Sequence, residues 1–208
     1  TKAAAAGGFT TVCCMPNTNP PLDSTAAIRN LAAKTKAEGV VRVLPIACIT
    51  RGRQGKETTA MAGLVSEGVV GFSDDGSPVI DTKLMRSVLE WSSIFDMTII
   101  DHCEDTALTA GGVINQGKVS LELGLPGMPA SAEESMIERD IRLADETAGS
   151  LHIAHVSTAK GVELIRKAKK KHLKITAEVT PHHLTLTEEK VKDSGTMAKV
   201  NPPLRTTA

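Results

Sequence analysis

The sequence of 208 residues lacks an excess of charge of either sign, because Lys plus Arg and Asp plus Glu both number 24. Without a net field, the chain has no general attraction for nucleic acid or anionic membranes. It also contains no apolar stretch near the ~20 residues that a membrane-spanning helix needs. The one strongly basic run, residues 166–172, ends a predicted helix, where lysines suit the negative end of the helix dipole. We therefore expect neither nucleic acid nor a membrane as a partner.

Cysteines are few, and their spacing indicates no disulfide framework. The four of them (Cys13, Cys14, Cys48 and Cys103) form no CxxC pair and lie in or beside apolar runs. Such cysteines are typical of buried, reduced thiols in a cytoplasmic protein. No signal peptide is visible either, so the expected location is the cytoplasm.

Strand-like and helix-like segments alternate along almost the whole chain. Strands are predicted at 9–14, 40–48, 69–73, 97–101, 151–156 and 173–180, and a short helix end is predicted before the first of them. The strands are nearly continuous apolar runs, which is typical of strands covered on both faces. Alternating β and α segments of this kind predict a parallel sheet, either open or closed into a barrel.

Three of these apolar runs stop at a residue that can bind a metal ion. They read GVVGFSDDG, MTIIDHCED and SLHIAHVST, and they deliver Asp75, His102 and His155. In a parallel barrel the strand ends converge on one face, so residues far apart in the sequence can surround one ion. Two imidazoles and a carboxylate form a ligand set of catalytic zinc, with water in the fourth position.

Neighbouring residues compete for two of these three roles. Asp74 precedes Asp75, and adjacent strand residues face opposite ways, so only one of them can point at a metal. His152 lies three residues before His155 on the same strand, so the period of two places it on the opposite face. We expect His152 to be structural and the apparent HxxH motif to be false.

Several motifs in order resemble the cyclic amidohydrolases, and among them most closely the bacterial type I dihydroorotases. They are TKAAAAGGFTTVCCMPNTNPP, GFSDDGSPV, DHCED, IAHVSTAKGVELIRKAK, ITAEVTPHHL and KVNPPLR. The resemblance implies a zinc-dependent (β/α)₈ barrel. It also implies an enzyme that interconverts dihydroorotate and N-carbamoyl-L-aspartate in pyrimidine biosynthesis.

Carried over position by position, the resemblance implies that Asp75, His102 and His155 are metal ligands. Many relatives have a carboxylated lysine where Asp75 falls, and the GVVGFSDDG strand contains no lysine. Asn17, in MPNT, matches the position that contacts the substrate carboxylate, although the same residues are also good turn formers. The resemblance assigns no chemical role to His182, His183, Lys199, Asn201 and Arg205, which are expected at the rim of the site.

Two parts of the family pattern do not occur in the sequence. An H-x-H-x-R strand is expected before Thr1, and the aspartate that acts as general acid and base is expected beyond Ala208. The resemblance therefore predicts an incomplete TIM (β/α)₈ barrel, an internal fragment with strands 2–7 present and strands 1 and 8 missing. Residues 1–208 would form one partial amidohydrolase barrel domain, inactive by itself.

Other functions are compatible with the same residues. One alternative is a non-catalytic dihydroorotase homologue that serves as the structural partner of a transcarbamoylase. Another is a hydantoinase or an allantoinase. The retained set of Asp75, His102 and His155 favours an enzyme with a small-molecule substrate. The resemblance also allows a homo-oligomer or an association with an aspartate transcarbamoylase.

Overall fold

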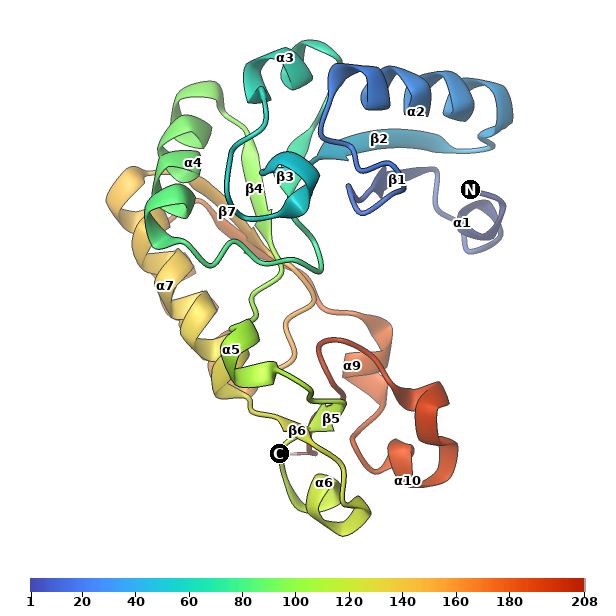
Figure 1. The fold of residues 1–208 in the computed structure, drawn as a ribbon, viewed down its shortest axis with the longest axis vertical. Coiled ribbons are helices and arrows are strands. Elements are labelled where there is room, and N and C mark those ends of the chain that lie inside the picture. Colours follow the sequence, from blue (N-terminus) through green and yellow to red (C-terminus); the bar gives the residue numbers. More distant parts are fainter. Residues whose placement is uncertain (208) are drawn as a thin grey trace. The chain divides into compact units, whose positions relative to one another are not determined.

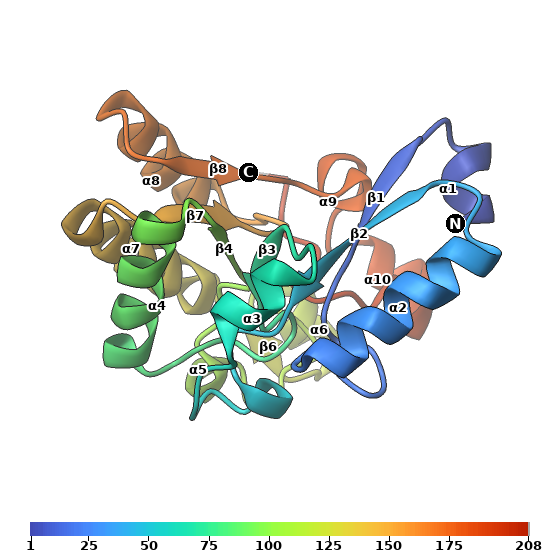
Figure 2. The ribbon, with the colours of Figure 1, turned by 90° about the horizontal axis from the view of Figure 1, so that it is seen from above.

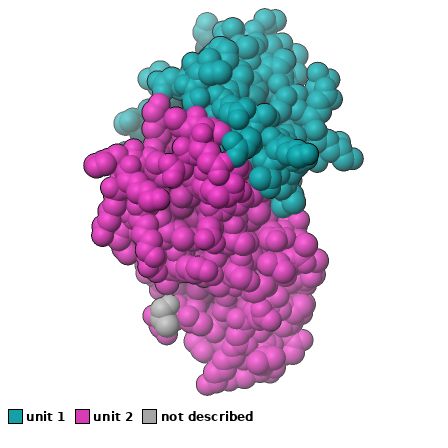
Figure 3. Space-filling view, turned by 90° about the vertical axis from the view of Figure 1, so that its left-hand side faces the viewer, with its two compact units in different colours: residues 1–101 teal, residues 102–208 magenta. Residues whose placement is uncertain are grey.

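The computed structural model describes residues 1–207. The chain divides into two compact units, residues 1–101 and 102–208, which are coloured separately in Figure 3. Both units are α/β, with parallel strands connected by helices. Within the described residues, no helix is both long enough and apolar enough to span a bilayer.

Unit 1 contains a run of four parallel strands with the helices between them (Figure 1). Its elements are α1 (Lys2–Ala6), β1 (Thr11–Cys14), α2 (Thr25–Glu38), β2 (Arg42–Ala47), the 3₁₀ helix η1 (Arg51–Arg53), α3 (Met61–Ser66), β3 (Gly71–Ser73), α4 (Thr82–Phe95) and β4 (Thr98–Asp101). Each strand pairs with the next in the chain, with Val12 opposite Val43 and Phe72 opposite Ile99. The carboxyl ends of β1 to β4 therefore share one edge.

Local sequence explains where the two long helices of unit 1 begin. The hydroxyl of Ser24 accepts a hydrogen bond from the Ala27 amide at 3.3 Å, and the Asp81 carboxylate accepts one from the Lys83 amide at 2.7 Å. Both are N-cap contacts that satisfy amides left over at a helix start. Helix α2 packs on β2 and α4 packs on β4 (Figure 2). In the core, Phe72 meets the ring of Trp91 edge to face, with centroids 5.4 Å apart.

Unit 2 contains two further parallel strands and a more irregular region. Its elements are α5 (Thr106–Thr109), β5 (Ile114–Asn115), α6 (Lys118–Leu123), β6 (Gly127–Met128), α7 (Ser131–Thr147), β7 (Ser150–Ile153), α8 (Ala159–Lys170), β8 (Ile175–Ala177), α9 (Pro181–Thr185), α10 (Lys190–Ser194) and η2 (Gly195–Ala198). Strands β7 and β8 pair with Leu151 opposite Ile175, and β5 and β6 form a separate short parallel pair.

The core of unit 2 lies where α7 packs on β7 and on α8, and where α8 packs on β8. The side chains of Ile137, Leu143 and Leu151 are fully buried there. Thr158 caps α8 by accepting a hydrogen bond from the Gly161 amide at 3.2 Å. The other end of α8 carries Lys167, Lys169 and Lys170 in its last turn, as expected from the helix dipole.

Each of the six predicted strand segments overlaps a strand, and the predicted helix end at the start is α1. The connection between β4 and α7 is long and rich in Gly and Pro, and it contains α5, β5, α6 and β6. The expectation of four buried thiols was wrong for Cys13 and was met only in part for Cys14. The four cysteines are all reduced; Cys48 and Cys103 are buried, but Cys14 is half-buried and Cys13 is exposed. The reason is that β1 alternates exposed and half-buried residues, so one of its faces is uncovered.

Candidate metal centre

The predicted metal ligands all follow the carboxyl end of a strand. Asp75 comes two residues after β3, His102 comes directly after β4, and His155 comes two residues after β7. Asp75 belongs to unit 1, whereas His102 and His155 belong to unit 2. The surroundings of these residues are therefore described for each unit by itself.

In unit 1 the structure brings Asp75 and Asn17 together, 58 positions apart in the sequence. The Asn17 amide donates a hydrogen bond to the Asp75 carboxylate at 2.8 Å. The backbone of Asp75 is also held, because its amide donates to the Ser73 hydroxyl at 3.0 Å and its carbonyl accepts from Arg53 at 2.6 Å. Parallel pairing of β1, β2 and β3 explains the meeting, since it places the loops after these strands at one edge.

Asp74 and Asp75 have different surroundings. Asp74 is only 3% exposed, and its carboxylate accepts hydrogen bonds from the Thr50 amide at 3.1 Å and from the Thr50 hydroxyl. Burial raises the pKa of Asp74, against the lowering effect of these hydrogen bonds. Asp75 is half-buried. Asp74 thus ties the end of β2 to the end of β3, and Asp75 is the more accessible carboxylate.

In unit 2 the rings of His102 and His155 face each other. Nδ1 of His102 lies 2.8 Å from Nε2 of His155, and the ring planes are 78° apart. His102 is 4% exposed and His155 is half-buried. His155 has a φ of 34°, in the left-handed region that a residue with a Cβ adopts at a cost. Backbone strain of this kind is concentrated at functional sites.

The other ring nitrogen of His102 contacts a residue for which the sequence suggested no role. Nε2 of His102 lies 2.7 Å from the Glu104 carboxylate. That carboxylate also accepts hydrogen bonds from the Thr109 hydroxyl and, at 2.9 Å, from the Asn201 amide. The bond from His102, helped by those from Thr109 and Asn201, lowers the pKa of Glu104 to about 2. The spacing of two residues in DHCED was the only signal of this contact in the sequence.

The facing nitrogens of His102 and His155 fit a metal ion. A tetrahedral zinc with bonds of about 2.0–2.1 Å keeps two ring nitrogens roughly 3.4 Å apart. The observed 2.8 Å differs from this by about half an ångström, so small ring movements suffice. A histidine that binds a metal usually donates its other ring N–H to a carboxylate or a similar acceptor. Glu104 is such an acceptor for His102.

The structure places His152 away from this pair, in contacts to β8 and the residues after it. Its Nδ1 lies 2.7 Å from the Thr176 hydroxyl, and its Nε2 lies 3.6 Å from the Glu178 carboxylate. His152 thus contacts Thr176 and Glu178, whereas His155, two residues beyond the end of β7, faces His102.

Of the predicted rim residues, His183, Asn201 and Arg205 lie in one network of unit 2. Nε2 of His183 lies 3.0 Å from the Pro202 carbonyl, and burial lowers the pKa of this histidine. Arg205 donates to the Ser157 hydroxyl at 3.0 Å and to the Asn115 side chain at 2.8 Å. The segment 199–205 therefore ties together the loops that follow β4, β7 and β8. His182 is half-buried and Lys199 is exposed.

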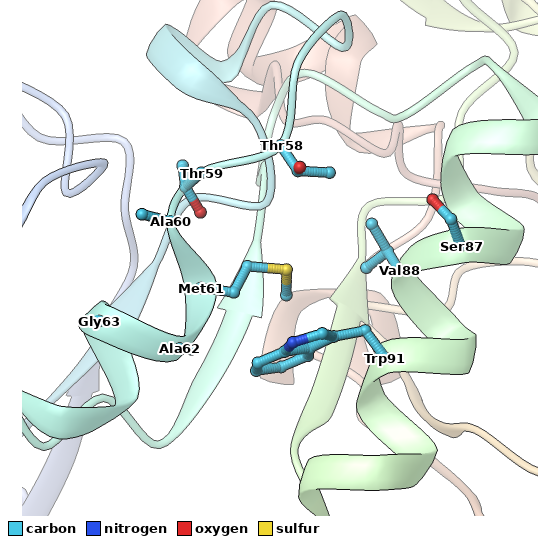
Figure 4. A pocket seen from close by; sticks show the side chains of 9 residues that line it. All are labelled: Thr58, Thr59, Ala60, Met61, Ala62, Gly63, Ser87, Val88 and Trp91. Carbon is cyan, nitrogen blue, oxygen red and sulfur yellow. The ribbon is translucent and has the colours of Figure 1, made fainter.

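A cavity of about 360 Å³ in unit 1 involves none of these residues. It lies between α3 and α4 and is lined by side chains that include Met61, Val88 and Trp91 (Figure 4). Helices α3 and α4 are parts of the strand-to-strand connections, and none of the predicted metal-ligand residues lines the cavity. We therefore do not associate it with the candidate metal centre.

Comparison with known proteins decides the family. Residues 1–161 match the family described as "Dihydro-orotase-like". The chain belongs to this family. Curated proteins named dihydroorotase are similar to it: those of Caldanaerobacter subterraneus, at 53% identity over 206 residues, and Aquifex aeolicus, at 52% over 204. These matches cover 99% and 98% of this chain and 48% of each relative, so the chain spans about half the length of the curated relatives it matches.

Solved structures support the fold class. The chain is similar to the L-hydantoinase from Arthrobacter aurescens, with a TM-score of 0.82 and 23% identity, over 99% of this chain and 47% of that one. It is also similar to the dihydropyrimidinase from Brevibacillus agri, with a TM-score of 0.75 and 20% identity, over 98% of this chain and 46% of that one. At these identities the likeness concerns the fold alone. The α/β fold with parallel strands is thus confirmed as hydantoinase-like, without evidence about the substrate.

Proposed function

We propose that this chain is the metal-binding part of a zinc-dependent dihydroorotase. The complete enzyme would interconvert dihydroorotate and N-carbamoyl-L-aspartate in pyrimidine biosynthesis, in the cytoplasm. The observation that carries the proposal is the facing pair of His102 and His155 at two strand ends. It occurs in a chain that is about half identical to proteins named dihydroorotase.

We propose Asp75, His102 and His155 as the ligands of one zinc ion. The half-buried carboxylate of Asp75 and the facing ring nitrogens of the histidines support this choice. When bound, the ion supplies Lewis acidity, which activates water for attack and polarises the ring amide carbonyl. The residues of this chain hold the site in shape: Asn17 fixes the Asp75 carboxylate, and Glu104 fixes His102.

Asn17 has a second role in this proposal, as a donor to the substrate carboxylate. Its amide carries two N–H groups, and the bond to Asp75 uses one of them. The side chain is exposed after β1, on the same edge as Asp75. A carboxylate bound there would lie beside Asp75, and this contact would orient the ring of the substrate.

We also propose that the chain corresponds to strands 2–7 of a (β/α)₈ barrel and forms one partial barrel domain. The order of β1, β2, β3, β4, β7 and β8 along the chain supports it, together with their parallel pairing inside each unit. The H-x-H-x-R segment and the acid–base aspartate of the family pattern would then come from other parts of the complete enzyme.

The test is a chimera in which this chain replaces the matching half of the Caldanaerobacter subterraneus dihydroorotase. That relative is 53% identical to the chain over the exchanged segment, so the chimera should fold. We expect it to bind zinc and to turn over dihydroorotate, but neither hydantoin nor allantoin. A folded, zinc-loaded chimera without turnover would support a non-catalytic homologue that acts as a structural partner.

Matched variants of the chimera test the ligand assignment. His155→Ala removes a proposed ligand, whereas His152→Ala removes the neighbouring histidine, which contacts Thr176 instead. We expect the first variant to lose stoichiometric zinc and the second to keep it, as measured by atomic spectroscopy. Equal zinc contents in the two variants would refute the assignment.

A further inference from the structure

Glu104 is the candidate for a role beyond the proposed ligand set. It lies two residues after His102, and its carboxylate contacts Nε2 of that histidine at 2.7 Å. The opposite ring nitrogen, Nδ1, is the one that faces His155. Glu104 therefore touches the metal-binding histidine on the side away from the proposed ion.

This contact determines which nitrogen of His102 carries the proton. An ionised carboxylate can only accept hydrogen bonds, so Nε2 of His102 must be the donor. In a neutral His102, Nδ1 is then unprotonated and accepts hydrogen bonds through its lone pair, which faces His155. The 2.8 Å contact between the two rings is accordingly a bond from Nε2 of His155 to Nδ1 of His102. A metal ion would replace the single proton that the two rings share.

Glu104 is itself held in place from two sides. The Thr109 hydroxyl donates to one carboxylate oxygen, and the Asn201 amide donates to the other at 2.9 Å. Asn201 belongs to the segment 199–205, which is anchored by His183 at the Pro202 carbonyl and by Arg205 at Ser157. The carboxylate thus connects His102 to a segment about a hundred positions further along the chain.

We propose that Glu104, oriented by Asn201, is a positioning residue that keeps His102 in the tautomer with an unprotonated Nδ1, the form that can bind the metal. The proposal rests on the proposed function, because it assumes that His102 is a ligand. It assigns a role to Asn201, for which the sequence indicated only a place at the rim. Glu104 contacts His102 at Nε2, on the opposite side of the ring from Nδ1, so its loss should change metal affinity through His102.

The experiment compares Glu104→Gln and Asn201→Ala with the unchanged 208-residue chain. Glutamine keeps the size of the side chain but places an NH₂ group against at least one of the donors His102, Thr109 and Asn201. Glu163→Gln is the matched control, since Glu163 is an exposed glutamate on α8 paired with Lys167. Zinc affinity is measured by chelator competition, and the His102 tautomer by long-range ¹H–¹⁵N correlation spectra of the metal-free chain.

We expect Glu104→Gln to bind zinc about 10–100-fold more weakly, the usual effect of losing such a partner. The spectra should show His102 protonated at Nε2 in the unchanged chain and a mixture of tautomers in the variant. Asn201→Ala should have a zinc affinity and a tautomer ratio between those of the unchanged chain and those of Glu104→Gln. Glu163→Gln should match the unchanged chain in both measurements. If Glu104 had only a structural role, its replacement would not change the tautomer of His102.

The outcomes separate this inference from the proposed function. If the unchanged chain binds zinc and Glu104→Gln keeps both its affinity and the Nε2-protonated tautomer, the role of Glu104 is refuted while the ligand set stands. If zinc binding to the unchanged, folded chain does not depend on His102 and His155, the proposed function fails first. Should Glu104→Gln not fold, Asn201→Ala decides, because Asn201 is exposed and its replacement removes only one donor.

Discussion

Asn17 donates its amide to Asp75, so it touches a proposed metal ligand as well as, by proposal, the substrate. In the chimera, Asn17→Ala should lower kcat/KM roughly tenfold to a hundredfold, because a hydrogen bond to a charged group contributes about 1.5–3 kcal/mol. The contact is remote from the scissile amide and similar in the ground and transition states, so KM should rise more than kcat falls. Steady-state kinetics measures this split.

Zinc content is the control for Asn17→Ala. If the loss of the bond to Asp75 disturbed the metal site, zinc would fall together with kcat, and the kinetic change could not be assigned to substrate binding. An unchanged KM in a folded, zinc-loaded variant would leave Asn17 as a turn residue after β1.

The cysteines differ in exposure, and their reactivity should follow. Cys13 is exposed, whereas Cys48 and Cys103 are buried. Burial raises the pKa of the Cys48 thiol to about 12, so this group stays protonated at neutral pH and becomes the reactive thiolate only near pH 12. Alkylation of the native chain at neutral pH should therefore modify Cys13 first and leave Cys48 and Cys103 intact until unfolding. Peptide mass spectrometry reads the order, and equal rates at Cys13 and Cys48 would contradict it.

At the scale of elements, the close contact between α7 and α8 can be tested at Gly161. A Cβ at this position would lie 2.7 Å from the Thr158 hydroxyl and 2.8 Å from Cδ1 of Ile137. Gly161→Ala should lower the free energy of unfolding by about 1–3 kcal/mol, because overpacking outweighs the better helix propensity of alanine. Unfolding in urea, followed by circular dichroism, measures the change.

Gly63 in α3 is the matched control for Gly161. The nearest atom to a Cβ there is Cγ2 of Thr25 at 3.9 Å, an ordinary contact. Gly63→Ala should therefore leave stability unchanged or raise it by up to about 1 kcal/mol, the propensity difference alone. Destabilisation of the same size in both variants would mean that the packing of α8 is not the cause.

At the scale of the whole molecule, the chain spans about half the length of the relatives it matches. We expect the zinc-loaded 208-residue chain to lack turnover of dihydroorotate, although Asp75, His102 and His155 are present. By the resemblance, two more histidines and the acid–base aspartate are expected from other segments of the complete enzyme. Assays of the chain beside the chimera, at equal zinc content, measure the difference. Turnover by the chain at the rate of the chimera would show that those segments are dispensable.

The sequence by itself determined the strands and the residues that follow them. Alternating apolar runs and helical segments depend on local periodicity, so each of the six predicted strand segments overlaps a strand. The positions of Asp75, His102 and His155 just after strand ends were predictable because a strand end is a local feature. The exposure of Cys13 was not predictable in this way, because it depends on which elements pack on β1. Residues 9–14 by themselves do not indicate this.

Only the tertiary structure decided which side chains meet. Asn17 reaches Asp75 across 58 positions, and Asn201 reaches Glu104 across 97. The difference between Asp74 and Asp75 likewise depends on Thr50, which the parallel pairing of β2 and β3 brings to Asp74. Hydrogen bonds of this kind act over about 3 Å and require a defined direction, so they follow from the placement of whole strands and loops. Periodicity along the chain does not predict such contacts. The hydrogen bonds around His102 could therefore be identified only in the tertiary structure.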